Sequence, residues 1–320
     1  MFRAVLIFSR EGYPFMKKMF AYVATITLCA ALSASAQTLQ NRYLTVKVRA
    51  KDGAYEILSR ELQRRVLVSR VGAEINRQWV TSSDYPHHET TATSFEDALG
   101  TGHALKVTFS GLTNKPDLVC TLHLYDDEPY GDVSVEVRTM NRSINVQAIR
   151  DVDAVGKQLI DLGASEKDDR VLAETVSENP SMHIGSLAQA PHGDYFGVRS
   201  DLVYNLASKQ SLLLSALTTN RFLTVSHLLV SRDAGGEARI ASFTMDSTGT
   251  TKSILDRSRI LPDQQVQLSL PVAPGQWLSS ERGMFAVGPD YLQQLEDYGN
   301  AVRRLHHLHF SSGMSHEYGV

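Results

Sequence analysis

Three histidines near the C-terminus are the first residues whose types and spacing could do chemistry. They are His306, His307 and His309. Adjacent positions of a helix point about 100° apart, so only His306 and His309 would share a face. Zinc is rarely held by two ligands alone. We therefore expect these histidines to interact with the negative end of a helix dipole, and we predict neither a metal site nor a cofactor.

A second candidate is a pair of carboxylates. Asp151 and Asp153 lie two residues apart in a predicted strand, so both would face the same way. Paired carboxylates can serve as acid and base or can bind a cation. Arg150 and Arg170 could instead form ion pairs with them at the edge of the sheet. Because the sequence shows no third ligand, we interpret the pair as structural.

Two further stretches resemble carbohydrate sites in composition, because such sites often place an aromatic ring beside polar groups. Trp79 is flanked by polar residues on both sides. Buried packing is the commoner role of a tryptophan, and that alternative stays open. Residues 192–195 supply several polar groups in a predicted loop. Trp79, His192, Asp194 and Tyr195 are therefore our candidate carbohydrate-binding residues.

The motifs of the common catalytic sites are missing from the sequence. It contains no G-x-S-x-G nucleophile elbow, no P-loop and no H-E-x-x-H zinc motif. Gly100-Thr101-Gly102 begins a dinucleotide-binding fingerprint, but Leu105 stands where the third glycine should be. The acidic run Asp126-Asp127-Glu128 is typical of a solvated hairpin turn. We therefore assign no catalytic residue.

The elements that must position these residues are mostly strands. Apolar and polar residues alternate with a two-residue period, and Gly, Asp, Asn and Pro gather in the breaks between such runs. About a dozen short strands with one helix at the end predict an all-β fold, a large antiparallel β-sandwich. We expect a hairpin between residues 118–125 and 133–139. Other predicted strands are 43–48, 105–109, 146–155, 195–199, 202–205, 212–218, 222–228, 238–244 and 266–272.

Residues 289–309 form the one predicted helix. We expect Gly288 as its N-cap and Pro289 in its first turn. Gly299 costs about 1 kcal/mol relative to alanine, so packing must stabilise the helix. Because it follows a long β-rich region and only residues 310–320 come after it, we interpret it as a connector to a further partner. Its apolar stripe recurs every three or four positions, at Tyr291 or Leu292, Leu295, Tyr298, Val302, Leu305 and Leu308.

The N-terminus has the organisation of an export signal. A basic start at residues 16–18 precedes an apolar, uncharged run at 20–32, and the small residues 34–36 fit a cleavage site. We take Met16 as the true start and expect the mature chain to begin near Gln37. The apolar run is too short for a membrane span. The signal predicts export, to the periplasm or the extracellular space.

Loss of this leader makes the chain more acidic. Removing residues 1–36 takes away four of the 32 basic and one of the 35 acidic residues, which leaves 28 against 34 and a net charge of −6. A nucleic acid or an anionic membrane needs a basic face, so neither is an expected partner. Cys29 leaves with the signal, so Cys120 has no intrachain partner, and we expect a buried, inert thiol.

Four stretches, taken in order along the chain, carry a family resemblance. They are residues 141–152, residues 170–178, residues 216–224, and residues 279–285 leading into the helix. The first begins Asn141-Arg142-Ser143, the second Arg170-Val171-Leu172, and the third Ala216-Leu217-Thr218-Thr219-Asn220-Arg221. Through them the mature chain resembles the N-terminal part of the α-galactosidase-like glycoside hydrolases, a family often grouped with raffinose synthases.

The resemblance implies a fold and assigns catalysis to a separate domain. The family's N-terminal region is a β-supersandwich like that of galactose mutarotase, followed by a linking helix and a (β/α)8 barrel whose two aspartates are nucleophile and acid/base. The expected domains are therefore an upstream extension and leader (1–36), a β-supersandwich (37–288), a linker helix (289–309) and a short tail (310–320). The tail does not resemble the first barrel strand, so no residue of this sequence matches the catalytic aspartates.

Three functions follow as expectations. The first is the non-catalytic front of an exported α-galactosidase-like glycoside hydrolase, truncated before its barrel and inactive alone. The second is a free-standing carbohydrate-binding module that uses Trp79 and residues 192–195, with carbohydrate as the partner. The third is a structural or interaction protein that uses an apolar face which a barrel would otherwise cover.

Overall fold

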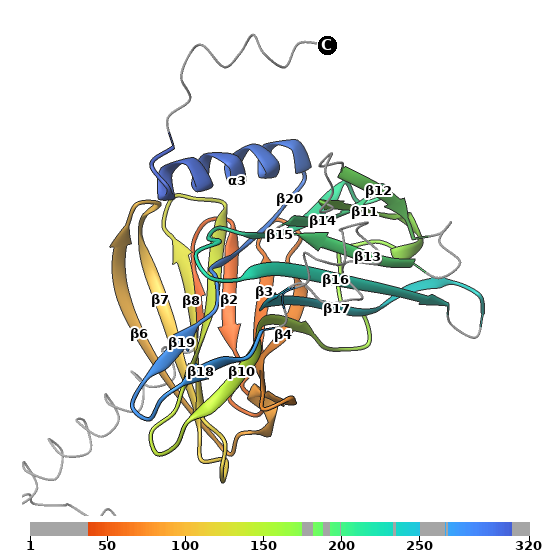
Figure 1. Ribbon diagram of the computed structural model, residues 1–320. Coiled ribbons are helices and arrows are strands. Elements are labelled where there is room, and N and C mark those ends of the chain that lie inside the picture. Colours follow the sequence, from red (N-terminus) through yellow and green to blue (C-terminus); the bar gives the residue numbers. More distant parts are fainter. Residues whose placement is uncertain are drawn as a thin grey trace, which may run out of the picture. The chain divides into compact units, whose positions relative to one another are not determined.

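Two antiparallel β-sheets packed face to face make up most of the described chain (Figure 1). The computed structural model describes residues 38–174, 182–187, 193–198, 200–232, 235–249, 266 and 268–308. Within these residues, two short 3-10 helices, η1 (Ser82–Asp84) and η2 (Glu166–Asp168), and one α-helix accompany the strands. The fold is a large β-sandwich of the galactose mutarotase-like type, as the sequence predicts.

The first sheet begins with the N-terminal strands. Its order is β1-β2-β3-β4-β10-β17-β16-β13, with β5 paired to β4 and β18 to β10. Strand β10 is irregular, because its register with β17 and with β4 shifts after Arg150. The strands are β1 (Thr38–Gln40), β2 (Leu44–Val48), β3 (Tyr55–Ser59), β4 (Arg64–Ile75), β5 (Gln78–Thr81), β10 (Ile144–Ala154), β13 (Gly193–Val198), β16 (Leu223–Arg232), β17 (Ala238–Thr248) and β18 (Leu270–Val272).

The second sheet has the order β12-β11-β14-β15-β20-β9-β8-β7-β6, with β19 paired to β9. It contains the predicted hairpin, because β8 and β9 pair in antiparallel register across the acidic turn. That prediction is confirmed. The strands are β6 (His87–Asp97), β7 (Gly100–Ser110), β8 (Asp117–Tyr125), β9 (Tyr130–Arg138), β11 (Asp169–Glu174), β12 (Met182–Ser186), β14 (Ser200–Asn205), β15 (Gln210–Ala216), β19 (Trp277–Ser279) and β20 (Gly283–Gly288).

The main core fills the space between the sheets. Alternate residues of each strand face it, which is why the two-residue period of the sequence is so regular. Val133, Val135 and Val137 of β9 are fully buried there. They share this core with residues of the first sheet, such as Val46 and Ile57. Cys120 lies in the same core, and burial raises the pKa of its thiol, as expected for an inert cysteine.

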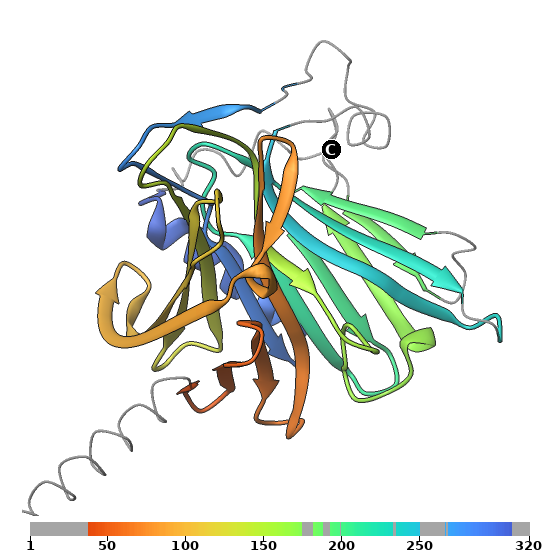
Figure 2. The same ribbon diagram turned by 90° about the horizontal axis from the view of Figure 1, so that it is seen from below.

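Helix α3 (Tyr291–Leu305) covers the outer face of the second sheet, across β15 and β20 (Figures 1 and 2). Neighbouring residues of β20 belong to different cores, since Phe285 faces the interior while Met284 and Ala286 face the helix. Gln294 and Ala301 are the buried residues of the helix, and Ala301 belongs to the core beneath it. Within the described ranges, no helix is long and apolar enough to span a membrane.

The start of α3 differs from the prediction. Asp290, not Gly288, is the N-cap, because its carboxylate accepts hydrogen bonds from the main-chain N–H groups of Leu292 and Gln293, 3.1 and 3.0 Å away. Two satisfied amides outweigh what a glycine could offer at that position. The stripe uses Tyr291, whereas Leu292 is 62% exposed.

Candidate functional site

Trp79 lies on β5 and is half exposed. The Arg150 guanidinium carbon sits 3.9 Å from the centre of the indole ring. Arg150 is held there by Asp246, whose two carboxylate oxygens accept from it at 2.6 and 2.9 Å. One face of the ring is therefore covered by a fixed cation, which leaves less of the indole for a sugar than the sequence suggests.

The second candidate stretch lies in a strand. Gly193–Val198 forms β13, which pairs with β16 and places Asp194 opposite Leu229 and Tyr195 opposite Leu228. The strand predicted from residue 195 is confirmed, but it begins earlier, so the predicted loop is wrong at Gly193 and Asp194. His192 lies outside the described residues. Strands β10, β17 and β16 separate β13 from β4, the strand that carries β5. The structure does not bring Trp79 together with these residues.

Asp151 and Asp153 do not act as a pair. The irregularity in β10 buries Asp151, whose carboxylate accepts from the Ser280 hydroxyl at 2.7 Å. Asp153 is paired with Arg70 at 2.6 Å, while Arg150 binds Asp246. The predicted common face and the predicted arginine partners are both wrong, because a bulge changes which side each residue faces. The structural interpretation of the two carboxylates stands.

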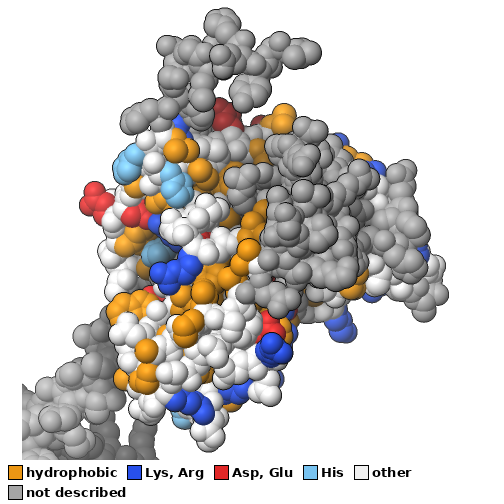
Figure 3. All heavy atoms as spheres, viewed as in Figure 1, with side chains coloured by type: hydrophobic (Ala, Val, Ile, Leu, Met, Phe, Trp, Pro, Cys, Tyr) orange, Lys and Arg blue, Asp and Glu red, His pale blue; other side chains and the backbone are white. Residues whose placement is uncertain are grey.

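The C-terminal histidines are predicted to interact with the end of their own helix, and the structure describes two of the three. A ring nitrogen of His306 lies 2.8 Å from the Leu217 main-chain oxygen, so this ring binds a neighbouring segment rather than the end of its own helix. Figure 3 shows histidine side chains on the surface around this end of α3. His309 lies outside the described residues. In the described part of the chain, no three His, Cys, Asp or Glu side chains converge as a metal site would require.

A buried ionic network lies beneath α3. Asp132 is fully buried, and its carboxylate accepts from Arg282 at 2.6 Å, from the Tyr125 hydroxyl at 2.8 Å and from His123 at 2.9 Å. Burial alone would raise the pKa of Asp132, but the His123 hydrogen bond and the Arg282 charge lower it. Asp97 contacts the same guanidinium at 2.9 Å. The network links β6, β8 and β9 to Arg282, the residue immediately before β20.

Glu281 is similarly tied to the main chain. It accepts from the Thr218 hydroxyl at 2.5 Å and from the N–H groups of Asn220, Arg221 and Phe222 at 3.0, 2.7 and 2.9 Å. Burial would raise the pKa of Glu281, yet these four hydrogen bonds outweigh it and lower the pKa. A carboxylate with so many donors shapes the loop before β16 and has little capacity left for a ligand.

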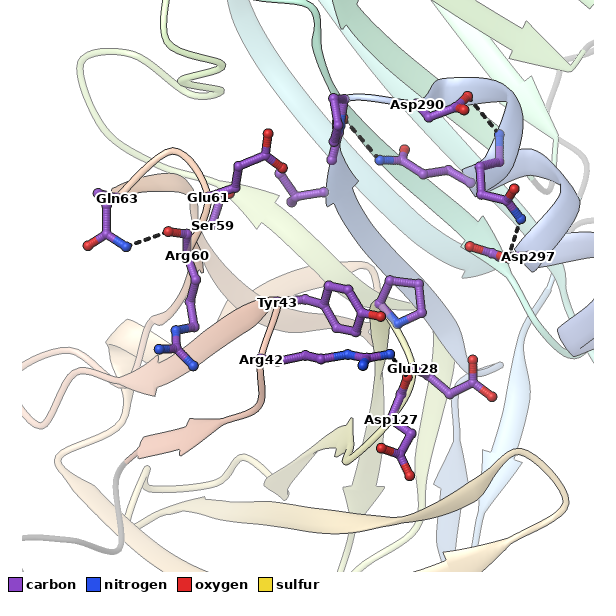
Figure 4. A pocket seen from close by; sticks show the side chains of 16 residues that line it. Arg42, Tyr43, Ser59, Arg60, Glu61, Gln63, Asp127, Glu128, Asp290 and Asp297 are labelled. Carbon is purple, nitrogen blue, oxygen red and sulfur yellow. Dashed lines mark hydrogen bonds between the residues drawn. The ribbon is translucent and has the colours of Figure 1, made fainter.

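A polar groove opens beside the start of α3 (Figure 4). We call it the α3 groove; its cavity volume is about 680 Å³. Four segments that lie far apart in the sequence form its walls. They are the β1–β2, β3–β4 and β8–β9 turns and the junction between β20 and α3.

The strand side of the groove is basic and aromatic. The Arg42 guanidinium lies over the Tyr43 ring, 4.5 Å from its centre, and donates to the Asp127 main-chain oxygen at 3.4 Å. Arg60 donates to the Asn41 main-chain oxygen at 2.8 Å. In Figure 4, Arg42 and Tyr43 reach toward the β8–β9 turn, and the α3 residues Asp290 and Asp297 lie across from them.

Carboxylates lie on both sides of the groove (Figure 4). Glu128 is paired with Arg304 of α3 at 2.6 Å, and Asp297 accepts from Gln293 at 2.9 Å. The Asp127 carboxylate has no hydrogen bond to any described residue. With Glu61 and Asp290, five carboxylates face two arginines, so the groove is acidic on balance. Such a site can both donate to and accept from an uncharged polar ligand.

Buried acids whose pKa is raised, such as Asp151, Asp169 and Asp201, lie elsewhere in the sandwich. Glycoside hydrolysis needs one carboxylic acid with a raised pKa beside a second carboxylate. We therefore treat the groove as a candidate binding site.

Sequence reasoning missed the α3 groove. It treated Asp127 and Glu128 as part of a solvated turn and gave Arg42 and Tyr43 no role. The polar residues at the start of α3 were a possible signal of a site. No local pattern, however, predicts that residue 42 lies near residues 127 and 297. Only the pairing of the strands does so.

Comparison with known proteins gives a likeness of fold. No protein-family model and no curated protein matches the chain. Among solved structures, the chain is similar to the α-galactosidase from Lactobacillus brevis, with a TM-score of 0.51 and 9% identity over 84% of this chain and 41% of that one. It is also similar to an α-N-acetylgalactosaminidase from Bifidobacterium bifidum, with a TM-score of 0.51 and 7% identity over 83% and 38%.

A third similar structure is not a glycosidase. It is a predicted aldose 1-epimerase from Klebsiella pneumoniae, with a TM-score of 0.50 and 11% identity, covering 82% of this chain and 80% of that one. The chain thus spans about two fifths of the two glycosidases but most of the epimerase. Together these likenesses show a fold that glycosidases and an epimerase-like protein share.

Proposed function

We propose that this chain is a non-catalytic β-sandwich region of an α-galactosidase-like glycoside hydrolase. The observation that carries the proposal is the match along 84% of this chain to 41% of an α-galactosidase structure. In the family that the sequence resembles, two barrel aspartates do the chemistry, and no stretch of this sequence resembles that barrel. Among the described carboxylates, those with a raised pKa do not line the α3 groove.

The experiment that tests this proposal is an assay of the purified chain on an aryl α-galactoside. We expect no release of the phenol above that in buffer, because a retaining hydrolase needs two carboxylates flanking the scissile bond. A known α-galactosidase in the same buffer serves as the positive control. Release that rises in proportion to the concentration of this chain would overturn the proposal.

We also propose that the chain is exported and loses residues 1–36. The compact unit of the fold begins at Gln37, the residue after the predicted cleavage site, and β1 begins at Thr38. On this proposal the supersandwich occupies residues 37–288 and α3 is the linker helix. N-terminal sequencing of protein recovered from the periplasm or medium should read Gln37 first; a product that begins at Met16 and stays in the cytoplasm would contradict export.

A further inference from the structure

We propose that the α3 groove is a binding site for an uncharged saccharide. The inference concerns binding alone and goes beyond the proposed function, which guides only the choice of galactosides as probes. It rests on the size of the groove, its mixed donors and acceptors, and the rigidity of its walls.

The size of the groove fits a small organic ligand. A volume of about 680 Å³ is in the range of protein pockets that bind such molecules and is far larger than an ion needs. The walls come from both sheets and from α3, so the hollow is a product of the whole fold. Its position beside the α3 start also separates it from Trp79 and β13, the sites that the sequence suggested.

The chemistry of the walls fits hydroxyl groups. A sugar hydroxyl donates one hydrogen bond and accepts others, so it is satisfied best by a carboxylate on one side and a guanidinium on the other. Arg42 has five N–H groups to donate and, among described residues, one hydrogen bond. Asp127 lies on the adjoining turn, and its carboxylate accepts no hydrogen bond from a described residue. Tyr43 lines the groove and carries the Arg42 guanidinium over its ring, 4.5 Å from the ring centre, which orients this donor toward a ligand.

The walls are fixed before any ligand arrives. Gln294 is held by the Ser211 hydroxyl at 3.1 Å and by the Gly288 main-chain oxygen at 3.3 Å. Asp290 is fixed as the cap of α3, and Arg60 is fixed on Asn41. A ligand would therefore order few side chains on binding, which removes one of the main costs of association.

The acidic charge of the groove disfavours anionic ligands. Five carboxylates against two arginines disfavour an anion, and the described residues contain no metal-binding cluster. A polyamine is the alternative that an acidic groove could attract. The two classes differ in their response to salt, because only the binding of a charged ligand is screened.

The test is a titration of the purified chain followed by ligand-observed NMR. The probes are methyl α-D-galactopyranoside, methyl α-D-glucopyranoside, raffinose and, as the cation, spermidine. We expect at least one saccharide to bind with an affinity that changes little from low to high salt. Failure of all three saccharides to bind, or binding of spermidine alone, would overturn the inference.

Three variants locate the site. Asp127→Asn and Tyr43→Ala should each weaken saccharide binding by about tenfold, the effect of losing one good contact. Asp126→Asn is the matched control, since it removes the same charge from the neighbouring residue, which does not line the groove. Unfolding curves establish that each variant is folded. Equal binding by Asp127→Asn and Asp126→Asn, with Tyr43→Ala also unaffected, would place the ligand elsewhere and contradict the inference.

Discussion

Individual buried acids set the pH response of this protein. Asp201 is 1% exposed, and neither of its carboxylate oxygens has a well-formed hydrogen bond to a described residue. Burial raises its pKa from 3.8 to about 8, which the nearby Ser226 hydroxyl offsets only in part. Burial likewise raises the pKa of Asp169 to about 7, although Asn205 donates to it at 2.7 Å. Both acids stay protonated in the folded protein at pH values where the unfolded chain has lost those protons.

The sign of the resulting pH dependence follows from proton binding. Between about pH 4 and the raised values, the folded state binds more protons than the unfolded state, so stability falls as pH rises. Each such group contributes a slope of about 1.4 kcal/mol per pH unit in its window. We predict that Asp201→Asn is more stable than the parent near pH 8, with a smaller difference near pH 5. Urea unfolding at both pH values measures this; an unchanged difference would show that Asp201 is not the titrating group.

The Asp132 network is the strongest polar contact beneath α3. We predict that Asp132→Asn lowers the free energy of unfolding by about 3 kcal/mol, because it leaves the buried Arg282 charge with Asp97 as its remaining carboxylate partner. Asp126→Asn is an exposed control and should change stability by less than about 1 kcal/mol. Denaturant unfolding of both variants tests the contrast. Equal, small effects would mean that Asp97 alone balances Arg282.

Helix α3 contains a glycine that its surroundings do not require. Gly299 is exposed, and an added Cβ would meet no atom within 4 Å. A glycine in such a position weakens a helix without any compensating contact. We predict that Gly299→Ala raises the free energy of unfolding by about 1 kcal/mol. Ala301→Gly, on the buried face two residues away, should lower it by at least about 1 kcal/mol.

Thermal unfolding of the two α3 variants provides the measurement. The melting temperature should rise for Gly299→Ala and fall for Ala301→Gly, since only the second removes a buried methyl group. A fall for Gly299→Ala would show that another surface approaches the helix at that residue.

The elements of this fold could be predicted because their signals are local. The alternation along 118–125 and 133–137 identifies the β8–β9 hairpin, and the stripe through Leu295, Tyr298 and Val302 identifies the packed face of α3. What could not be predicted depends on tertiary contacts. The bulge at Arg150 separated Asp151 from Asp153. The N-cap at Asp290 is different, because it is a local signal that the prediction missed: its carboxylate binds the amides two and three residues further on.

At the scale of the whole molecule, the fold was more predictable than the site. A sandwich follows from strand patterns that any window of the sequence displays. The α3 groove requires Arg42, Asp127 and Asp297 to meet, and only the order of strands in two sheets makes them neighbours. The surroundings of the predicted candidates depend on tertiary contacts for the same reason, since Arg150 covers one face of Trp79 and residues 193–198 pair with β16.

One measurement tests most directly whether the chain lacks hydrolase activity. It is a time course of NMR spectra of p-nitrophenyl α-D-galactopyranoside mixed with the purified chain. We predict that the spectra show no free galactose beyond a protein-free sample, because the described carboxylates with raised pKa values lie away from the groove. Free galactose that accumulates in proportion to the concentration of the chain would contradict the account.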